Sequence, residues 1–123
     1  MYQVSVEGHF DAAHYLRDYG GKCENLHGHR FKVVVSLKAK KLDKTGLAYD
    51  FTELKRRLNE VLDRFDHTSL TEVPPFDKIN PSSENIAREI YGQLKKRFPE
   101  GVVLSSVEVW ESPESRVKYS PGS

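Results

Sequence analysis

The sequence predicts an α+β fold, an antiparallel sheet with helices on one face, and its hydrophobic patterning is the basis of this prediction. Two runs of alternating apolar residues open the chain, two runs with apolar residues at three- and four-residue steps follow, and two shorter alternating runs end it. The expected order is β-β-α-α-β-β, a four-stranded antiparallel sheet and two helices in a single domain spanning residues 1–123. A chain of this length buries enough surface for one core without disulfides.

The strands are predicted from alternation, because successive side chains of a strand point to opposite faces. The first run has apolar residues at even positions and the second at odd positions, with Val34 as the one mismatch: Tyr2, Val4, Val6, Phe10 and Ala12, then Phe31, Val33, Val35, Leu37 and Ala39. The closing strands are expected at about Val102–Glu111 and Arg116–Tyr119. Such a sheet keeps a second face and two free edges, which an oligomer can cover.

Two amphipathic helices are predicted between the strand pairs. Asp50, with Glu53 three residues later, supplies an N-terminal cap for the first helix, and Ser82 or Ser83 supplies one for the second. Their apolar stripes are Phe51, Leu54, Leu58, Val61, Leu62 and Phe65, and Ile86, Ala87, Ile90, Tyr91, Leu94 and Phe98, with Pro99 and Gly101 ending the second helix.

Composition excludes several classes of function. The chain has 19 basic and 18 acidic residues and no basic arm or stripe interleaved with aromatic residues, so nucleic acid is not an expected partner. A single cysteine, Cys23, excludes an internal disulfide and favours a reducing compartment. The N-terminus begins in the first alternating run without a signal region, and no apolar run approaches the roughly 20 residues of a membrane span. We therefore expect a cytoplasmic protein that does not enter a membrane.

Three of the five histidines occupy positions where the strand pattern is apolar. His14 extends the even series of the first strand, and His27 and His29 extend the odd series that leads into the second. If these strands pair as a hairpin, the three imidazoles meet at one end of the sheet. Three neutral imidazoles with a fourth position open are typical of catalytic zinc, which acts as a Lewis acid on a substrate oxygen. The sequence therefore predicts a zinc site on His14, His27 and His29.

Other reactive residues lie near these histidines or at unusual positions. Cys23 precedes His27 by four residues, and a thiol beside a dication and a histidine becomes a usable base or nucleophile. Asp66 and His67 follow the first helix, where an aspartate can hold the histidine for a proton relay or simply be part of a polar helix end. Glu111 continues the apolar series of its strand, so it is either a carboxylate that binds substrate N–H donors or a solvated strand end.

Several motifs resemble the family of 6-pyruvoyltetrahydropterin synthases and 6-carboxytetrahydropterin synthases. They span nearly the whole chain in the family's order: Phe10-Asp11-Ala12-Ala13-His14, Cys23-Glu24-Asn25-Leu26-His27-Gly28-His29, Asp50-Phe51, Asp66-His67, Pro81-Ser82-Ser83-Glu84-Asn85 and Val109-Trp110-Glu111-Ser112. The Cys-x-x-x-His-Gly-His motif is specific to the family. Thr71 stands where relatives often have Asn, and the segment from Arg17 to Lys22 matches no family motif.

The resemblance implies the tunnelling fold, in which subunits join their sheets into a barrel, usually as a homohexamer of two trimers with active sites between subunits. It implies zinc as the cofactor on the three predicted histidines and Cys23 as the base that abstracts protons. Asp66 and His67 would be its relay partners. Glu111 would anchor the pterin ring, and Glu84 matches a position near the pterin pocket.

Spacing within the motif favours one branch of the family. Three residues separate Cys23 from His27, as in the bacterial carboxy-type enzymes of queuosine (7-deazaguanine) biosynthesis, whereas the animal pyruvoyl-type enzymes have a longer gap. The implied reaction converts 7,8-dihydroneopterin triphosphate to 6-carboxy-5,6,7,8-tetrahydropterin, acetaldehyde and triphosphate. Arg17 and Lys22 are candidate cations for the triphosphate. A pyruvoyl product, formed by triphosphate elimination without side-chain cleavage, remains the alternative activity.

Two further readings belong to other classes of protein. Gly21 followed by His27-x-His29 resembles the start of the metal-binding motif of cupin oxygenases, but that motif needs a glutamate where Val33 and Val34 stand, and two central helices do not suit a jelly roll. A non-catalytic zinc-binding or pterin-binding module is the other reading. It predicts that Cys23 and Asp66 are dispensable.

Overall fold

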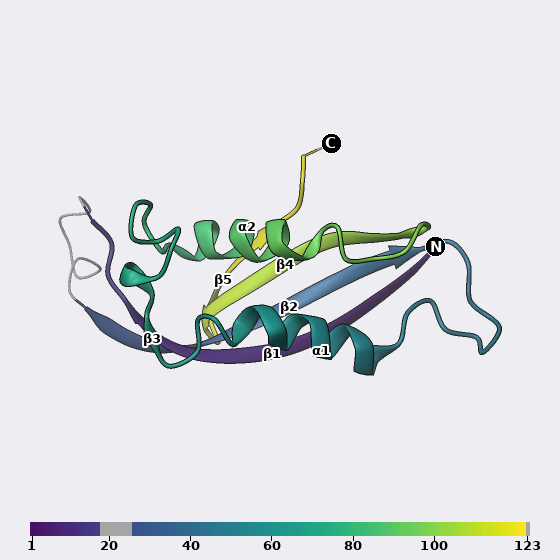
Figure 1. The fold of residues 1–123 in the computed structure, drawn as a ribbon, viewed down its shortest axis with the longest axis horizontal. Coiled ribbons are helices and arrows are strands. Elements are labelled where there is room, and N and C mark those ends of the chain that lie inside the picture. The colour runs from purple at the N-terminus through teal and green to yellow at the C-terminus, as the bar shows by residue number, and fades with distance from the viewer. Residues whose placement is uncertain (18–25, 123) are drawn as a thin grey trace.

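The structure, a computed structural model, describes residues 1–17 and 26–122, except for the side chain of His27. A five-stranded sheet, in the order β3-β1-β2-β4-β5, carries both helices on one side, and its strands β1, β2 and β4 are long (Figure 1). In chain order the elements are β1 (Tyr2–His14), β2 (His27–Ala39), α1 (Phe51–Leu62), β3 (Thr68–Ser69), the 3₁₀ turn η2 (Leu70–Glu72), α2 (Ser83–Leu94), β4 (Val102–Ser112) and β5 (Ser115–Tyr119).

The strands β1, β2, β4 and β5 and the two helices confirm the predicted α+β architecture and its order. The sheet also has a fifth strand, β3, which the sequence analysis did not predict. It is two residues long and pairs in parallel with Ala12 and Ala13 of β1. An element of two residues has no hydrophobic period, so alternation had no means of detecting it.

The pairing of β1 with β2 sets the geometry of the whole sheet. These strands are antiparallel in an unbroken register in which Phe10 lies opposite Phe31 and His14 lies opposite His27. β4 continues the sheet beside β2, with an irregularity between Ser36 and Leu37, and β5 follows β4 as an antiparallel edge strand. Each strand therefore turns its apolar series toward the helices, as the alternation predicted.

Both helices begin where the capping residues predict. The Asp50 carboxylate accepts the Thr52 N–H at 2.8 Å, and the Ser82 hydroxyl accepts the Asn85 N–H at 3.2 Å. The apolar stripes extend beyond the helical ends at Leu62 and Leu94, because the chain continues in tight turns with bonds between residues three apart. Phe65 is thus fully buried although it lies outside α1.

The two faces of the sheet differ in chemistry. The face beneath the helices holds the core, where Phe31, Val33 and Val35 have no exposed surface. The opposite face, called here the open face, carries charged and polar side chains, including Lys32 and Arg116 on either side of Trp110. No helix among the described residues is long and apolar enough to cross a membrane.

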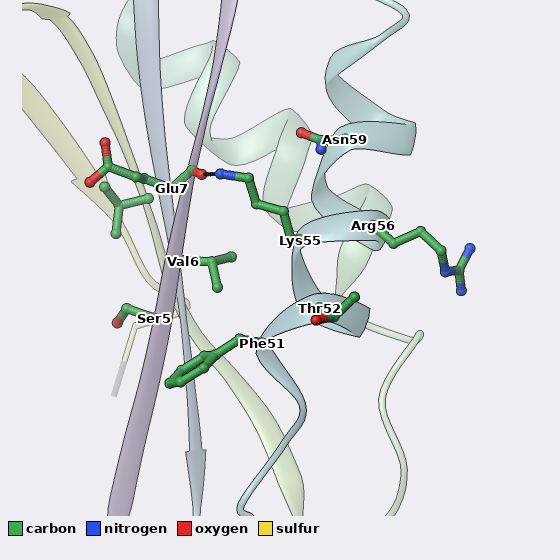
Figure 2. Close-up of a pocket in the computed structure, with 9 residues that line it drawn as sticks. Ser5, Val6, Glu7, Phe51, Thr52, Lys55, Arg56 and Asn59 are labelled. Carbon is green, nitrogen blue, oxygen red and sulfur yellow. Dashed lines mark hydrogen bonds between the residues drawn. The ribbon is translucent and has the colours of Figure 1, made fainter.

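The outer edge of β1 borders a hollow of about 740 Å³ between the strand and α1 (Figure 2). Lys55 reaches from α1 and donates a hydrogen bond to the Glu7 main-chain carbonyl. A lysine at this position satisfies a strand carbonyl and blunts the edge against uncontrolled pairing. Phe51, at the start of α1, is 62% exposed beside the same hollow.

The close approach of α1 to β1 depends on Gly8. A Cβ at this position would lie 2.9 Å from Leu62 Cδ1 and 3.2 Å from Leu58 Cδ2, and both leucines are fully enclosed. We expect Gly8→Ala to lower the free energy of unfolding by about 1 kcal/mol, since overpacking exceeds the backbone entropy gained by removing a glycine.

Gly92→Ala is the matched control for this prediction. Gly92 lies in α2 with open space around its Cα, so the same substitution should raise stability by about 0.5–1 kcal/mol. Urea unfolding followed by circular dichroism measures both changes. Equal effects of the two substitutions would contradict the packing argument.

Candidate functional site

Two histidines and a glutamate converge at the end of the sheet where β1 and β2 are joined. The His29 Nε2 atom lies 2.9 Å from Glu111 Oε1, and His14 Nε2 lies 3.4 Å from the same oxygen. The imidazole rings stand edge to face with centroids 5.4 Å apart. One ligand atom from each of the three residues falls within 4.8 Å of the others, so this group, called here the histidine–glutamate group, can hold a metal ion.

The strand register explains why these side chains meet. His29 lies opposite Ala12, two residues before His14, so both histidines project from the helix-covered face at one end of the hairpin. Glu111 follows Val107 and Val109 on β4, and its carboxylate is partly buried with 31% of the side chain exposed. His14, His29 and Glu111 therefore meet on the face that strand alternation predicts.

Aromatic rings pack against the buried side of the histidine–glutamate group. The ring of Phe31 lies edge-on to both imidazoles, with centroids 5.3 Å from His14 and 5.7 Å from His29, and it stacks on Phe10 at 4.8 Å. Phe31 has no exposed surface and the His14 side chain has only 3%, which keeps water away from that side of the group. Charge interactions at the group are strengthened by such a low-dielectric wall.

The His14 ring is also held by a hydrogen bond on its other nitrogen. Its Nδ1 atom lies 2.8 Å from the Pro81 carbonyl oxygen, which can only accept a hydrogen bond. Nδ1 therefore carries the proton, and in the neutral ring Nε2 is the nitrogen that offers a lone pair toward His29 and Glu111. A backbone carbonyl on the outer nitrogen is the usual support of a metal-binding histidine.

A hollow of about 180 Å³ opens beside the group. It is lined by His14, Glu111 and the start of α2, where Ser82, Ser83 and Glu84 follow one another. The Ser83 hydroxyl donates to Glu111 Oε2 at 3.4 Å, so the second carboxylate oxygen is oriented from α2. The predicted residue Glu84 thus lies in the same hollow as the predicted residue Glu111.

Asp66 and His67 form a second group at the edge of β1. His67 Nδ1 lies 3.1 Å from Asp66 Oδ2, and Asp66 Oδ1 accepts the Asp11 main-chain N–H at 2.8 Å. The His67 main chain donates to the Asp11 carbonyl at 2.6 Å and adopts a positive φ of 58°, which is uncommon for a residue other than glycine. These bonds hold His67 against β1, although 79% of its side chain is exposed.

Asp11 completes this second group, because one carboxylate oxygen of Asp11 lies within 4.8 Å of ligand atoms of both Asp66 and His67. The Arg30 Nε atom donates to Asp11 Oδ1 at 3.1 Å, and this hydrogen bond lowers the pKa of Asp11 below its ordinary value. Asp11 alternates with Ala12 and so projects from the open face, opposite to His14. The second group therefore lies on the other side of β1 from the histidine–glutamate group.

The structure brings together some of the predicted site residues and leaves others untested. The predicted base, Cys23, lies outside the described residues. For His27 only the backbone is described, and it lies opposite His14 as the predicted hairpin requires. The contact of the Pro81 carbonyl with His14 and the place of Asp11 beside Asp66 were not predicted, although both residues belong to the quoted motifs. Main-chain contacts between distant segments leave no pattern of residue types.

Comparison with known proteins places this geometry in a family. Residues 3–122 match the family described as 6-pyruvoyl tetrahydropterin synthase. The chain is 33% identical to a 6-carboxy-5,6,7,8-tetrahydropterin synthase of Haemophilus influenzae, covering 97% of this chain and 99% of the relative. It is 36% identical to the human 6-pyruvoyl tetrahydrobiopterin synthase, covering 80% of this chain and 70% of the relative.

A solved structure agrees with this relationship. The 6-pyruvoyl tetrahydropterin synthase of Caenorhabditis elegans superimposes with a TM-score of 0.83 at 32% identity, covering 99% of this chain and 98% of the other. The fold is therefore the tunnelling fold, whose sheet is not closed within one chain. The length of the family match, together with these identities, shows that the chain belongs to the 6-pyruvoyl tetrahydropterin synthase family.

Proposed function

We propose that the protein is a zinc-dependent 6-carboxy-5,6,7,8-tetrahydropterin synthase of queuosine (7-deazaguanine) biosynthesis. The histidine–glutamate group, at the mouth of a hollow lined by family motif residues, is the observation that supports this proposal most directly. Near full-length similarity to a relative with this named activity supports the choice of reaction. The substrates are then 7,8-dihydroneopterin triphosphate and water, and the products are 6-carboxytetrahydropterin, acetaldehyde and triphosphate.

The donor atoms of the site fit zinc. Imidazole nitrogens are preferred zinc ligands, and His14 has its Nδ1 engaged by Pro81, which leaves Nε2 for the metal. We propose His14, His27 and His29 as the ligands, with Glu111 beside them. A zinc ion bound by these residues supplies a Lewis acid that polarises a substrate oxygen.

The remaining residues would bind the substrate and move protons. Glu111 and Glu84 border the same hollow and offer carboxylate acceptors to the N–H donors of a pterin ring. Asp66 holds Nδ1 of His67, so the Nε2 of this exposed ring is free to exchange protons with a partner group. We propose that the partner is the thiol of Cys23, acting as the base.

We further propose that each active site is shared between subunits of a homohexamer. The Asp66–His67 pair lies beside Asp11 on the open-face side of β1, away from the histidine–glutamate group of the same chain. The hollow at that group is also smaller than the roughly 300 Å³ at which ligand pockets usually begin. A neighbouring subunit that supplies its Asp66–His67 pair would complete both the cavity and the proton relay.

The metal proposal predicts about one zinc per chain in the purified protein, measured by metal analysis. His14→Ala combined with His29→Ala should remove the zinc, because both substitutions delete imidazole ligands. Glu111→Gln distinguishes two roles for the carboxylate. Retained zinc with a raised KM indicates substrate binding, whereas lost zinc indicates that Glu111 is a ligand. Zinc content unchanged in the double histidine variant would contradict the site.

The shared-site proposal is tested by mixing two inactive variants. Cys23→Ala and His67→Ala should each lower kcat by about 10²–10⁴-fold, the usual contribution of a proton-transfer group. The two variants are then unfolded and refolded together in equal amounts. Roughly a quarter of wild-type activity should return, because random assembly places an intact Cys23 beside a neighbour's intact His67 at about a quarter of the sites. Recovery of no activity from assembled hexamers would show that both groups act within one chain.

The choice of reaction is tested by incubation with 7,8-dihydroneopterin triphosphate and identification of the products by mass spectrometry. We expect 6-carboxytetrahydropterin with acetaldehyde in equal amounts. A pyruvoyl product without acetaldehyde would assign the alternative activity, that of the human relative. Absence of any turnover by the zinc-loaded hexamer, with Cys23 and Asp66 both dispensable for pterin binding, would identify a non-catalytic binding module.

A further inference from the structure

The carbonyl that holds His14 belongs to a segment far away in the sequence. His14 Nδ1 donates to the Pro81 oxygen across a separation of 67 residues. The segments that carry these two groups must therefore be held side by side by other contacts, because a single hydrogen bond to a loop does not fix the direction of a carbonyl. The peptide between Asn80 and Pro81 has no N–H donor, so this part of the loop must be held by other groups.

The neighbouring residues of both segments provide such contacts. The Arg17 main-chain N–H donates to Asn80 Oδ1 at 2.9 Å, and Asn80 Nδ2 donates back to the Arg17 carbonyl at 3.0 Å. We call this reciprocal pair the Arg17–Asn80 clasp. The clasp joins the two segments, because Arg17 lies three residues after His14 and Asn80 directly precedes Pro81.

The guanidinium of Arg17 ties the clasp to the loop that leads to Pro81. Its Nη2 donates to the carbonyls of Thr71 and Phe76 at 2.9 and 2.8 Å, and its Nη1 donates to Ile79 at 3.2 Å. Only arginine offers several N–H donors in a planar fork that can serve separate carbonyls. This use directs the Arg17 charge at the protein's own backbone, and Lys22, the other cation considered for the triphosphate, lies outside the described residues.

Two further bonds extend the clasp. The buried Thr71 hydroxyl accepts the Tyr15 N–H at 3.3 Å, next to His14 in the chain. Asn85 Nδ2 donates to the Asn80 carbonyl at 2.9 Å, which connects the clasp to the first turn of α2. The clasp thus lies between His14 and the start of α2, which lines the hollow beside the histidine–glutamate group.

We propose that Arg17 and Asn80 are positioning residues of the metal site. By fixing the Pro81 carbonyl, the clasp keeps the proton of His14 on Nδ1 and aims Nε2 at the metal position, which preorganises the site before the ion binds. This inference rests on the proposed zinc function. A clasp that only stabilised the loop would affect folding without affecting the His14 tautomer or the affinity for zinc.

The experiment compares Asn80→Ala, Asn80→Asp and Arg17→Lys with wild type. Outer-sphere partners of metal ligands are worth about 10–100-fold in metal affinity, so we expect Asn80→Ala to raise the zinc Kd by that factor in competition with a chromophoric chelator. Asn80→Asp keeps the acceptor for the Arg17 N–H, and Arg17→Lys keeps both main-chain bonds. Both should therefore weaken zinc binding by less than Asn80→Ala.

A second measurement needs no metal. Nitrogen chemical shifts of the His14 imidazole in the zinc-free protein should report the Nδ1–H tautomer in wild type and a mixture of tautomers in Asn80→Ala. This signal depends on the Pro81 contact and not on global stability. If Asn80→Ala does not fold, the milder Arg17→Lys variant gives the same comparison with a smaller expected change.

Arg64→Met is the matched control. Arg64 also donates from a guanidinium to a carbonyl of this loop, that of Pro74 at 3.2 Å, but it does not take part in the clasp. Its loss should leave the zinc Kd and the His14 tautomer unchanged. Wild-type zinc affinity in folded Asn80→Ala, with only a lower Tm, would overturn the inference while leaving the zinc proposal intact. A wild-type protein that binds no zinc would instead overturn the zinc proposal, and this inference with it.

Discussion

The pairing of β1 with β2 is the constraint on which the other features of the site depend. The two strands run antiparallel through thirteen residues each without a break in register. Because side chains alternate between faces, a slip of one residue would move every core side chain to the open face. The buried series Phe10, Phe31, Val33 and Val35 prevents such a slip, and the same series carries His14 and His29 to the helix-covered side.

This pairing also separates two kinds of chemistry. Odd and even positions of β1 place Asp11 and His14 on opposite faces, only three residues apart. The imidazoles of His14 and His29 pack against the buried ring of Phe31 on the helix-covered side. Asp11 contacts Arg30 on the open face, and this hydrogen bond lowers the pKa of Asp11, so its carboxylate stays ionised at lower pH. A single chain therefore carries its two polar groups on opposite sides of β1. In the proposed homohexamer, a neighbouring subunit would bring the second group to the first, so assembly would complete the site.

The parts of the site that could be predicted are those that share the period of a strand. Apolar positions of the strands are occupied by His14, His29 and Glu111. Polar residues at such core-facing positions predicted that these side chains lie close together. The Asp66–His67 pair was ambiguous, because it follows a helix and its position depends on the short strand β3 and on the positive φ of His67. Helix lengths were overestimated for a related reason, since tight turns after Leu62 keep Phe65 on the apolar stripe without continuing the helix.

The sequence by itself determined the alternation, the capping residues and the residue types at the strand ends, and with them the fold class and the candidate ligands. All of these are local properties, set by side-chain direction and by backbone groups a few residues apart. Tertiary structure alone decided that Pro81 supports His14, that Arg17 serves three distant carbonyls and that Asp66 is bound by the main chain of Asp11. These contacts use main-chain atoms, which every residue has, so no residue type or spacing announces them before the chain is folded.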